Sequence, residues 1–204
     1  MKKNLEKIKN FLIKEFFVEL DVYKTNKKLY KSINYIDVCK IDISDIKKGK
    51  YVYYTEQLKN EIKEQFNIKK YLTEKAKILF FITTFIFILI TLLTFFINNY
   101  TNLSLFFLIV SIFYLFIAFL KELEVIYPRK LYFLETYINV FFNVYKVKIY
   151  SNDNKTSILK DLIKNKKKNS FILMILANNL LSSTLLLRNS IISLLIFILL
   201  NLLK

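Results

Sequence analysis

The sequence predicts a mainly α-helical membrane protein, in which transmembrane helical hairpins are joined to a small α+β cytoplasmic part. Two long uncharged apolar runs follow each other closely, a large basic excess lies outside them, and short stretches of alternating β-forming residues lie in the basic regions. The 204 residues are 54% hydrophobic and yet carry a net charge of +16. Soluble globular domains seldom combine these two properties, so a membrane protein is the first expectation.

The transmembrane hairpin is predicted over residues 78–120. Its first run, residues 78–97, contains no charge and would be about 30 Å long as a helix, which matches the hydrocarbon core of a bilayer. The second run, residues 103–120, is also uncharged. Only the short polar linker 98–102 separates the two runs, so the two spans are expected to form a tight helical hairpin.

The charge distribution predicts the orientation of these spans. Residues 1–77 contain 19 Lys against 11 acidic residues, and residues 121–170 contain 11 Lys and Arg against 5 acidic residues. Basic flanks mark the cytoplasmic side of membrane helices, so we expect both regions, and with them the N-terminus, in the cytoplasm. Nucleic-acid binding is the competing explanation, but Lys interspersed with acids beside a membrane favours topology and attraction to anionic lipid.

The N-terminal region, residues 1–77, is expected to begin with an amphipathic helix. Apolar residues from Leu5 to Leu20 recur at steps of three and four, with charged residues between them. This period is typical of a helix with one buried face. The helix would either pack on the cytoplasmic part or lie in the lipid interface.

A β-hairpin is predicted next. Residues 36–38 and 41–43 alternate between apolar and acidic side chains, and residues 51–54 are aromatic and β-branched. Gly49, the single glycine of the chain, lies between these runs and would form the turn. From Thr55 onward no helix-breaking residue precedes Ile78, so one helix is expected to run from the cytoplasm into the membrane.

The second basic region, residues 121–170, is predicted to contain a third strand. Pro128 should end the helix of the second span. The aromatic stretch 131–142 would suit the membrane interface, residues 144–150 alternate like a strand, and residues 151–154 resemble a turn. A short basic helix is expected over residues 157–168. Three strands are more stable than an isolated hairpin, so a composite sheet is expected.

The C-terminal membrane segment, residues 171–204, permits two arrangements. Two apolar runs flank Arg188, Asn189 and Ser190. A turn there would make two short spans, four in all, and would keep the arginine out of the bilayer centre, where it costs about 2.5 to 3.5 kcal/mol. The alternative is one span from about Thr184 to Leu203, preceded by an interfacial helix. We favour four spans, although the last would be only about 20 Å long.

The composition argues against catalysis and cofactor binding. The chain has no His, a single Gly and a single Cys, Cys39, so a catalytic His pair, a Gly-rich phosphate loop, a disulfide and an ordinary zinc site are not expected. No catalytic, metal or cofactor residue is therefore predicted. Glu122, Glu124 and Glu135 could form a carboxylate site, but acidic residues near a helix end are more often simply solvated.

A polar flank is predicted on the C-terminal apolar segment. It consists of two pairs spaced four residues apart, Asn178 with Ser182 and Asn179 with Ser183. Polar side chains in lipid seek partners, so the flank would pack within the monomer's own bundle, join copies in a homo-oligomer or line a pore. Thr83, Thr84, Thr91 and Thr94 are weaker candidates because a threonine hydroxyl often bonds to its own helix.

A basic cluster precedes this segment, and it comprises Lys164, Lys166, Lys167 and Lys168. Each lysine near a membrane surface contributes about 1 kcal/mol of attraction to anionic lipid headgroups. Marking of the cytoplasmic side is a sufficient explanation of the cluster, and contact with headgroups is the functional alternative.

The overall plan resembles the small multi-pass transmembrane effectors of bacterial anti-phage defence systems, including those associated with cyclic-nucleotide signalling. The resemblance lies in residues 71–77, which lead directly into a tight hairpin, and in Asn165 with Asn169 ahead of the later apolar segment. It implies a protein that impairs the inner membrane when an infection signal arrives. No nucleotide-binding residues are carried over from the resemblance.

The sequence thus yields two functional hypotheses. The first is a non-enzymatic effector that assembles in the cytoplasmic membrane and perturbs it. The second is an anchor or structural subunit that holds a soluble protein partner at the membrane. A transporter ranks third, because we expect no intramembrane acidic side chains that would couple ions.

Overall fold

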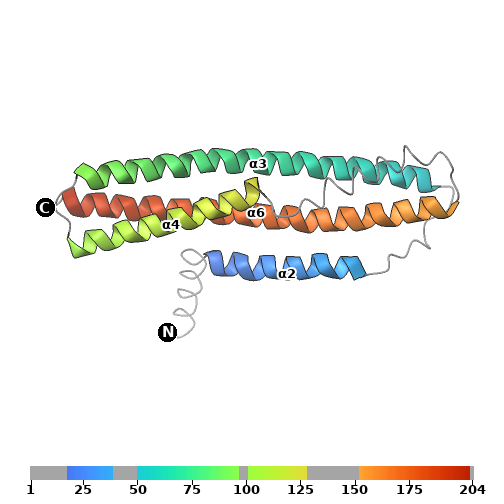
Figure 1. Ribbon diagram of the computed structural model, residues 1–204, viewed down its shortest axis with the longest axis horizontal. Helices are drawn as coiled ribbons and strands as arrows, with labels where there is room; N and C mark the ends of the chain where they lie inside the picture. Colours follow the sequence, from blue (N-terminus) through green and yellow to red (C-terminus); the bar gives the residue numbers. More distant parts are fainter. Residues whose placement is uncertain (1–17, 39–49, 97–100, 128–151, 203–204) are drawn as a thin grey trace, which may run out of the picture. The chain divides into compact units, whose positions relative to one another are not determined.

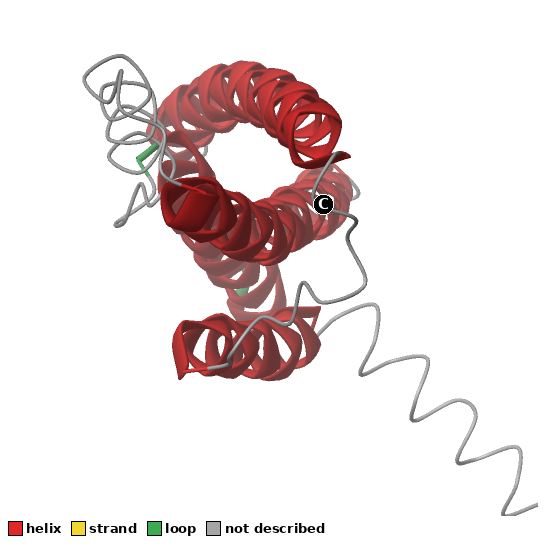
Figure 2. Cartoon of the chain, turned by 90° about the vertical axis from the view of Figure 1, so that its right-hand side faces the viewer, coloured by secondary structure: helices red, strands yellow, loops and turns green. Residues whose placement is uncertain are grey.

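The computed structural model describes residues 18–38, 50–96, 101–127 and 152–202. These residues form the helices α2 (Val18–Val38), α3 (Tyr51–Phe96), α4 (Asn102–Ile126) and α6 (Asn152–Leu202) (Figure 1). No strand is present among the described residues (Figure 2). Three of the helices, α3, α4 and α6, are long and apolar enough to cross a membrane.

The chain divides into two compact units, which are described separately. The apolar unit comprises residues 1–25, 72–127 and 177–204. The polar unit comprises residues 26–71 and 128–176. Both α3 and α6 contribute residues to each unit, so each of these helices carries two different kinds of surface along its length.

In the apolar unit, parts of α3, α4 and α6 form a three-helix bundle. Glu122 of α4 contacts Ser183 of α6, and Ser111 of α4 contacts Ser190. The residue numbers rise along one helix as they fall along the other, so α4 and α6 are antiparallel. The predicted hairpin of α3 and α4 is also present, with Phe119 of α4 packed against Phe80 at a centroid distance of 4.9 Å and against Phe87 at 6.5 Å.

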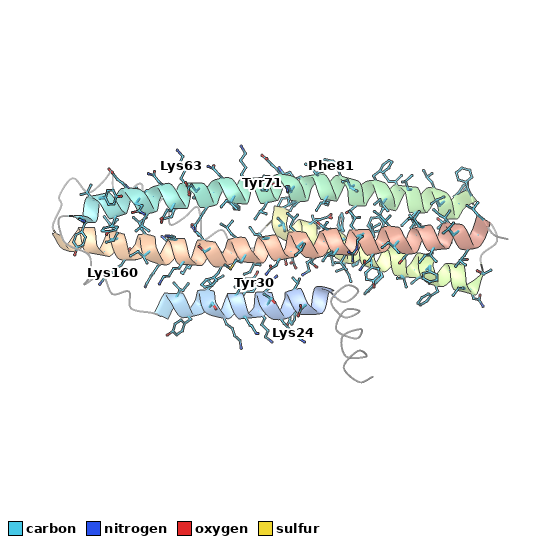
Figure 3. The ribbon with its side chains drawn as sticks, turned by 180° about the vertical axis from the view of Figure 1, so that it is seen from behind. Lys24, Tyr30, Lys63, Tyr71, Phe81 and Lys160 are labelled. Atoms are coloured by element: carbon cyan, nitrogen blue, oxygen red, sulfur yellow. The ribbon has the colours of Figure 1, made fainter. Side chains whose placement is uncertain are left out.

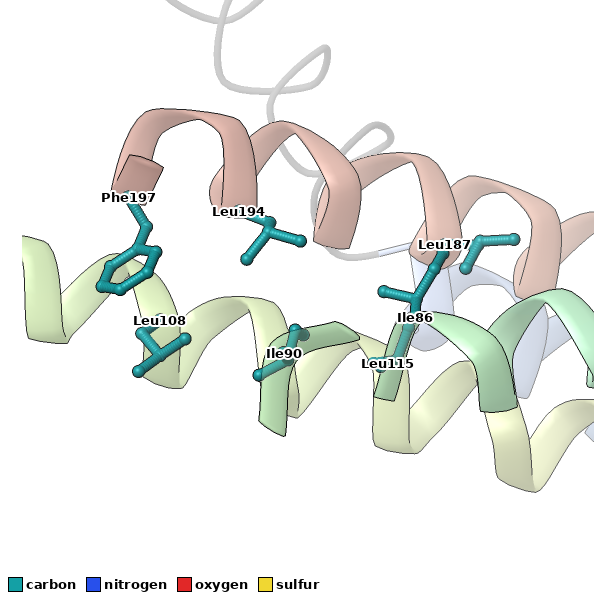
Figure 4. Close-up of a cluster of buried hydrophobic side chains, with 7 residues drawn as sticks. All are labelled: Ile86, Ile90, Leu108, Leu115, Leu187, Leu194 and Phe197. Atoms are coloured by element: carbon teal, nitrogen blue, oxygen red, sulfur yellow. The ribbon is translucent and has the colours of Figure 1, made fainter. Parts of the chain in front are cut away.

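The interior of this bundle contains one cluster of buried apolar side chains (Figure 4). Its members come from all three helices: Ile86, Ile90, Leu108, Leu115, Leu187, Leu194 and Phe197. Each large side chain buried in this way supports the bundle by dispersion contacts, which in a membrane do more than the hydrophobic effect to hold helices together.

The buried residues of α4 recur with a regular period. They are separated by alternating steps of four and three residues: Ser104, Leu108, Ser111, Leu115, Ala118, Glu122 and Val125. This heptad period is typical of helices that interdigitate along a shallow crossing angle. Thr101 begins the helix with a reciprocal capping box, in which its hydroxyl accepts from the Ser104 amide and the Ser104 hydroxyl accepts from the Thr101 amide.

The outer surface of the apolar unit is lined with large apolar side chains. Phe81 is 72% exposed and Phe85 is 60% exposed on α3, and Phe113 on α4 is 59% exposed. Phe81 points away from α6 in Figure 3. Water would not tolerate so large an apolar surface on a monomer, whereas lipid would, so the arrangement is that of a membrane bundle.

In the polar unit, α3 and α6 pack through apolar side chains with polar contacts beside them. Ile62, Leu159 and Leu162 are buried. Lys166 Nζ pairs with Glu61 Oε2 at 2.6 Å. Gln65 Nε2 donates to the Lys166 carbonyl at 3.2 Å and to the Ser170 hydroxyl oxygen at 3.0 Å. The outer side is charged, as Lys63 in Figure 3 illustrates.

The predicted α+β character is wrong in the described part of the chain. Residues 36–38 lie in the last turn of α2, and residues 51–54 form the start of α3. The alternating pattern of these stretches is only three or four residues long, and helix formation by the flanking residues overrides it. Residues 41–43, Gly49 and residues 131–151 lie outside the described residues, as do residues 1–17 of the predicted amphipathic helix.

The helix expected from Thr55 into the apolar run is confirmed, because α3 is continuous. Helix α4 ends at Ile126, ahead of Pro128. The predicted turns at residues 151–154 and 188–190 are wrong, since α6 begins at Asn152 and continues unbroken to Leu202. A break at Arg188 would leave backbone groups without partners in an apolar medium, and the continuous helix avoids that cost.

Candidate functional site

A carboxyl group is buried inside the apolar unit, about one helical turn before the end of α4 at Ile126. Glu122 occupies an inner position of the α4 heptad, and its side chain is fully buried. Leu115 occupies the same heptad position one repeat earlier, and Leu108 occupies it two repeats earlier. An acidic side chain therefore takes the place that a leucine holds elsewhere in the helix, although an acidic group among apolar residues is costly.

Hydroxyl groups from the other two helices bond to this carboxyl. Thr83 of α3 donates to Glu122 Oε1 at 2.9 Å, and Ser183 of α6 donates to the same oxygen at 2.7 Å. Thr83 and Ser183 are also fully buried. The three side chains form the carboxyl layer, in which each helix of the bundle contributes one polar group.

The second oxygen of the carboxyl is in a different situation. Glu122 Oε2 is buried and has no hydrogen-bond partner in the described part of the chain. Buried polar atoms are nearly always bonded, so an exception calls for a chemical explanation such as an absent proton, ion or water. The carboxyl layer therefore contains an acidic oxygen that needs such an explanation.

A second polar contact, the serine layer, joins α4 and α6 two helical turns away along α6. The Ser111 hydroxyl donates to the Ser190 carbonyl at 2.9 Å, and the Ser190 hydroxyl donates to the Ser111 carbonyl at 2.9 Å. Both side chains are fully buried. The small serines allow the two backbones to approach closely, as small residues do at helix contacts in membranes. Leu115 and Leu187 are buried between the two polar layers.

The predicted polar flank lies partly inside the bundle. Asn179, Ser182 and Ser183 are buried, whereas Asn178 is half-buried. Asn179 Nδ2 donates to Glu124 Oε2 at 3.0 Å, so the flank supplies contacts to α4 of the same chain. Among the threonines named from the sequence, Thr84, Thr91 and Thr94 donate to carbonyls of their own helix, and Thr83 instead reaches Glu122.

The predicted basic cluster lies on the part of α6 that belongs to the polar unit. Lys166 forms the ion pair with Glu61. Of the four lysines only Lys167 is exposed, whereas Lys164 and Lys168 are half-buried. The ion pair neutralises part of the charge that was expected to meet lipid headgroups. The positions of these lysines relative to a membrane follow from sequence reasoning alone.

The acidic residues weighed from the sequence have different environments. Glu124 has a side chain that is 51% exposed and pairs with Lys121 at 3.3 Å, as expected for a solvated residue near a helix end. Glu122, in contrast, is buried, so its solvated interpretation is wrong. Glu135 lies outside the described residues. The seven-residue spacing of Leu108, Leu115 and Glu122 was the signal that would have identified the buried carboxyl.

The chemistry of the site is that of a single carboxyl among hydroxyl groups. In the described part of the chain, no group of three or more His, Cys, Asp or Glu residues could hold a metal ion. The carboxyl layer offers hydrogen-bond donors and one acid, which suits proton exchange or polar packing more than nucleophilic catalysis.

The three long apolar helices, with their exposed apolar surface and buried polar groups, are compatible with a multi-pass membrane protein. Comparison of the chain with protein-family models, with curated proteins and with solved structures found no match.

Proposed function

We propose that the protein is a non-enzymatic, multi-pass protein of a bacterial cytoplasmic membrane that acts as an effector and makes the membrane permeable to ions, in the manner of the anti-phage effectors it resembles. The observation that carries this proposal is the polar interior of the apolar unit. Glu122, Thr83, Ser183, Ser111 and Ser190 are all fully buried in a bundle whose outer surface is apolar.

Burying polar groups in a membrane bundle costs free energy, and apolar side chains would pack the same helices without that cost. Leucine at the Glu122 position would continue the heptad of Leu108 and Leu115 and would pack without an acidic group. Intramembrane acidic residues commonly mark the paths of ions and protons. The carboxyl layer and the serine layer would supply two such polar stations along one bundle.

An apolar barrier between these layers would keep the resting protein closed. Leu115 is fully buried, Leu187 and Ile86 are nearly so, and all three belong to the same apolar cluster (Figure 4). Apolar constrictions gate membrane pores by excluding water. An effector of this design would conduct when assembly or a trigger separates these side chains and lets water connect the polar layers.

Self-assembly would use the outer surface, because the predicted polar flank is largely taken up inside the chain. Arg188 is exposed within the apolar part of α6, where its guanidinium donates to Asn189 Oδ1 at 3.2 Å. A charged group facing lipid is expensive. Contact of Arg188 with a second copy or with a lipid headgroup would lower that cost.

The test is membrane depolarisation on inducible expression in bacteria together with the neighbouring genes, followed with a potential-sensitive dye. We expect the wild-type chain to depolarise cells, and Leu115→Ser to do so at a lower expression level because it hydrates the barrier. Ile109→Ser is the matched control, since Ile109 on the same helix is 58% exposed, and it should behave as wild type. The effector role would be refuted if cells with the wild-type protein in their membrane and cells with the Leu115→Ser protein in theirs both kept an intact membrane potential.

A second candidate function, the membrane anchor, is favoured by the surface of the polar unit. Tyr30 is 57% exposed and Tyr35 is 70% exposed on α2, and Tyr53 on α3 is 65% exposed. Exposed tyrosines are common at protein–protein contacts. If the protein is an anchor, a soluble protein should co-purify from solubilised membranes and should be lost in Tyr30→Ala/Tyr35→Ala but retained in Lys24→Ala. Purification of the chain alone would argue against an anchor.

A further inference from the structure

The geometry of the carboxyl layer points to a specific ligand, and we propose that Glu122 is a proton-binding site which carries a proton on Oε2 in the closed bundle. The basis is the combination of a fully buried carboxyl, two hydroxyl donors on one of its oxygens and no hydrogen-bond partner on the other. This inference does not rest on the proposed effector function, because it concerns the state of the closed bundle.

The electrostatic argument starts from the unbonded oxygen. A carboxylate divides its negative charge between Oε1 and Oε2, and here only Oε1 receives hydrogen bonds. A buried charge without a compensating group is strongly unfavourable, because nothing replaces the hydration that the ion loses. A proton on Oε2 removes the charge at the one atom where nothing else in the described part of the chain offsets it.

The hydrogen bonds are compatible with this protonated form. With the proton on Oε2, Oε1 is a carbonyl-type oxygen that has two lone pairs to accept from Thr83 and Ser183. Each hydroxyl has its own hydrogen to donate, so both contacts remain when the carboxyl is neutral. The layer therefore holds its shape in the neutral form without any rearrangement.

A metal ion suits the same layer less well. Hard cations such as Ca²⁺ and Mg²⁺ take about six or more oxygen ligands. Glu122 is hydrogen-bonded to only two hydroxyl oxygens, both at Oε1, and the described residues offer no cluster of acidic, His or Cys side chains for a metal. A single proton needs no such ligand set.

The charged residues on the three helices nearest to the site do not supply the missing counter-charge. They are Lys77 on α3, Lys121 and Glu124 on α4, and Arg188 on α6. Lys121 pairs with Glu124, Arg188 donates to Asn189, and Lys77 is exposed. Among the described residues, Glu122 is thus bonded to hydroxyl groups and not to a cation.

Release of this proton would be coupled to opening of the bundle. In the release step, the Oε2–H bond breaks, the proton passes to a water molecule, and the carboxylate keeps the electron pair. Because the side chain is fully buried, water must first enter between the helices. Ionisation and hydration of the carboxyl layer are therefore expected to occur together.

The experiment is labelling of the full-length protein, purified in detergent, with the apolar reagent dicyclohexylcarbodiimide, which reacts with protonated carboxyls in apolar surroundings. Peptide mass spectrometry of the wild-type chain locates the adduct, so the result does not depend on a variant's folding. We expect labelling at Glu122 at pH about 7, where carboxyls in water are ionised and do not react. Glu122→Gln should lose the adduct, and Glu124→Gln, the matched control on the same helix, should keep it.

Two outcomes would overturn the proposal. One is an absence of adduct at Glu122 at pH about 7 in protein whose other carboxyls are labelled at acidic pH. The other is protection by sodium chloride, but not by choline chloride, at constant pH, which would mean that the site takes a metal cation. Because labelling does not measure membrane potential, its failure and a failure to depolarise cells are separate results.

Discussion

The two units of this chain bury opposite kinds of side chain. The polar unit buries Ile62, Leu159 and Leu162 and exposes charged residues such as Lys63. The apolar unit exposes large side chains such as Phe85 and buries hydroxyl groups and a carboxyl in addition to its apolar cluster. A charged surface suits water and an apolar surface suits lipid, so the difference is the one expected if the two units face these two media.

Helix α3 makes this contrast within a single element. Its outward residues change from Lys63 to Phe81 (Figure 3), while its inward residues change from Gln65 and Ile62 to Thr83 and Ile86. The helical period is the same in both parts. The residue types on the inward face of α3 therefore depend on packing in each unit, and those on the outward face depend on the medium that suits them.

The largest effect should come from truncating a core leucine of the polar unit. Leu162 is 2% exposed, and Leu162→Ala should destabilise this unit by about 3 kcal/mol through lost burial and the cavity left behind. Hydrogen exchange of the purified protein, read over residues 152–176, would show the loss. Lys160→Ala, two residues earlier and exposed, should change little. Equal effects of the two variants would mean that α6 has no buried face in this unit.

A charge on the outer surface tests the medium directly. Phe85 is 60% exposed and Tyr53 is 65% exposed on the same helix. Phe85→Lys should reduce membrane insertion by about 2.5 kcal/mol, since a lysine there would face lipid, whereas Tyr53→Lys should be tolerated. A glycosylation-based insertion assay of each variant would measure the difference. If both variants inserted as well as wild type, the outward surface of α3 near Phe85 would not face lipid.

Sequence reasoning succeeded where one property extends over a long segment. The uncharged runs near 78–97 and 103–120 predicted the helical hairpin, and α3 and α4 contain them. It failed where the signal was short. Residues 51–54 resemble a strand when taken alone, but they are the first turn of a 46-residue helix. In such a case the cooperativity of the long helix outweighs the local β propensity.

The buried carboxyl of Glu122 is a second case in which a short sequence signal was not enough for a correct prediction. The hydroxyl residues of α6 could be identified from their spacing, but their partner could not, because Glu122 lies beside Lys121 and Glu124 in a segment with the composition of a helix end. Burial of Glu122 is decided by its place in the α4 heptad and by packing against α3 and α6. Neither the heptad position nor the packing of Glu122 can be inferred from the composition of the segment.

A smaller effect is expected from the serine layer of the apolar unit. Ser111→Ala removes the hydroxyl that donates to the Ser190 carbonyl, while the Ser190 hydroxyl still donates to the Ser111 carbonyl. The cost should be about 0.6 kcal/mol, the usual size of a polar contact between membrane helices. Thermal unfolding in detergent would measure it, with Ile109→Ala as the exposed control. A loss several times larger would mean that the close contact of α4 and α6 depends on both hydroxyls.

The smallest effect is expected from the ion pair of the polar unit. Lys166 and Glu61 have side chains that are 40% and 32% exposed, and their charged atoms are 2.6 Å apart. Partly exposed pairs are screened by water and salt, so a double-mutant cycle with Glu61→Gln and Lys166→Gln should give a coupling of about 0.5 kcal/mol that shrinks at high salt. A contact within the apolar unit, such as those of the carboxyl layer, should in contrast be insensitive to salt. A coupling at Glu61 and Lys166 that salt leaves unchanged would show that the polar unit shields its charges as the apolar unit does.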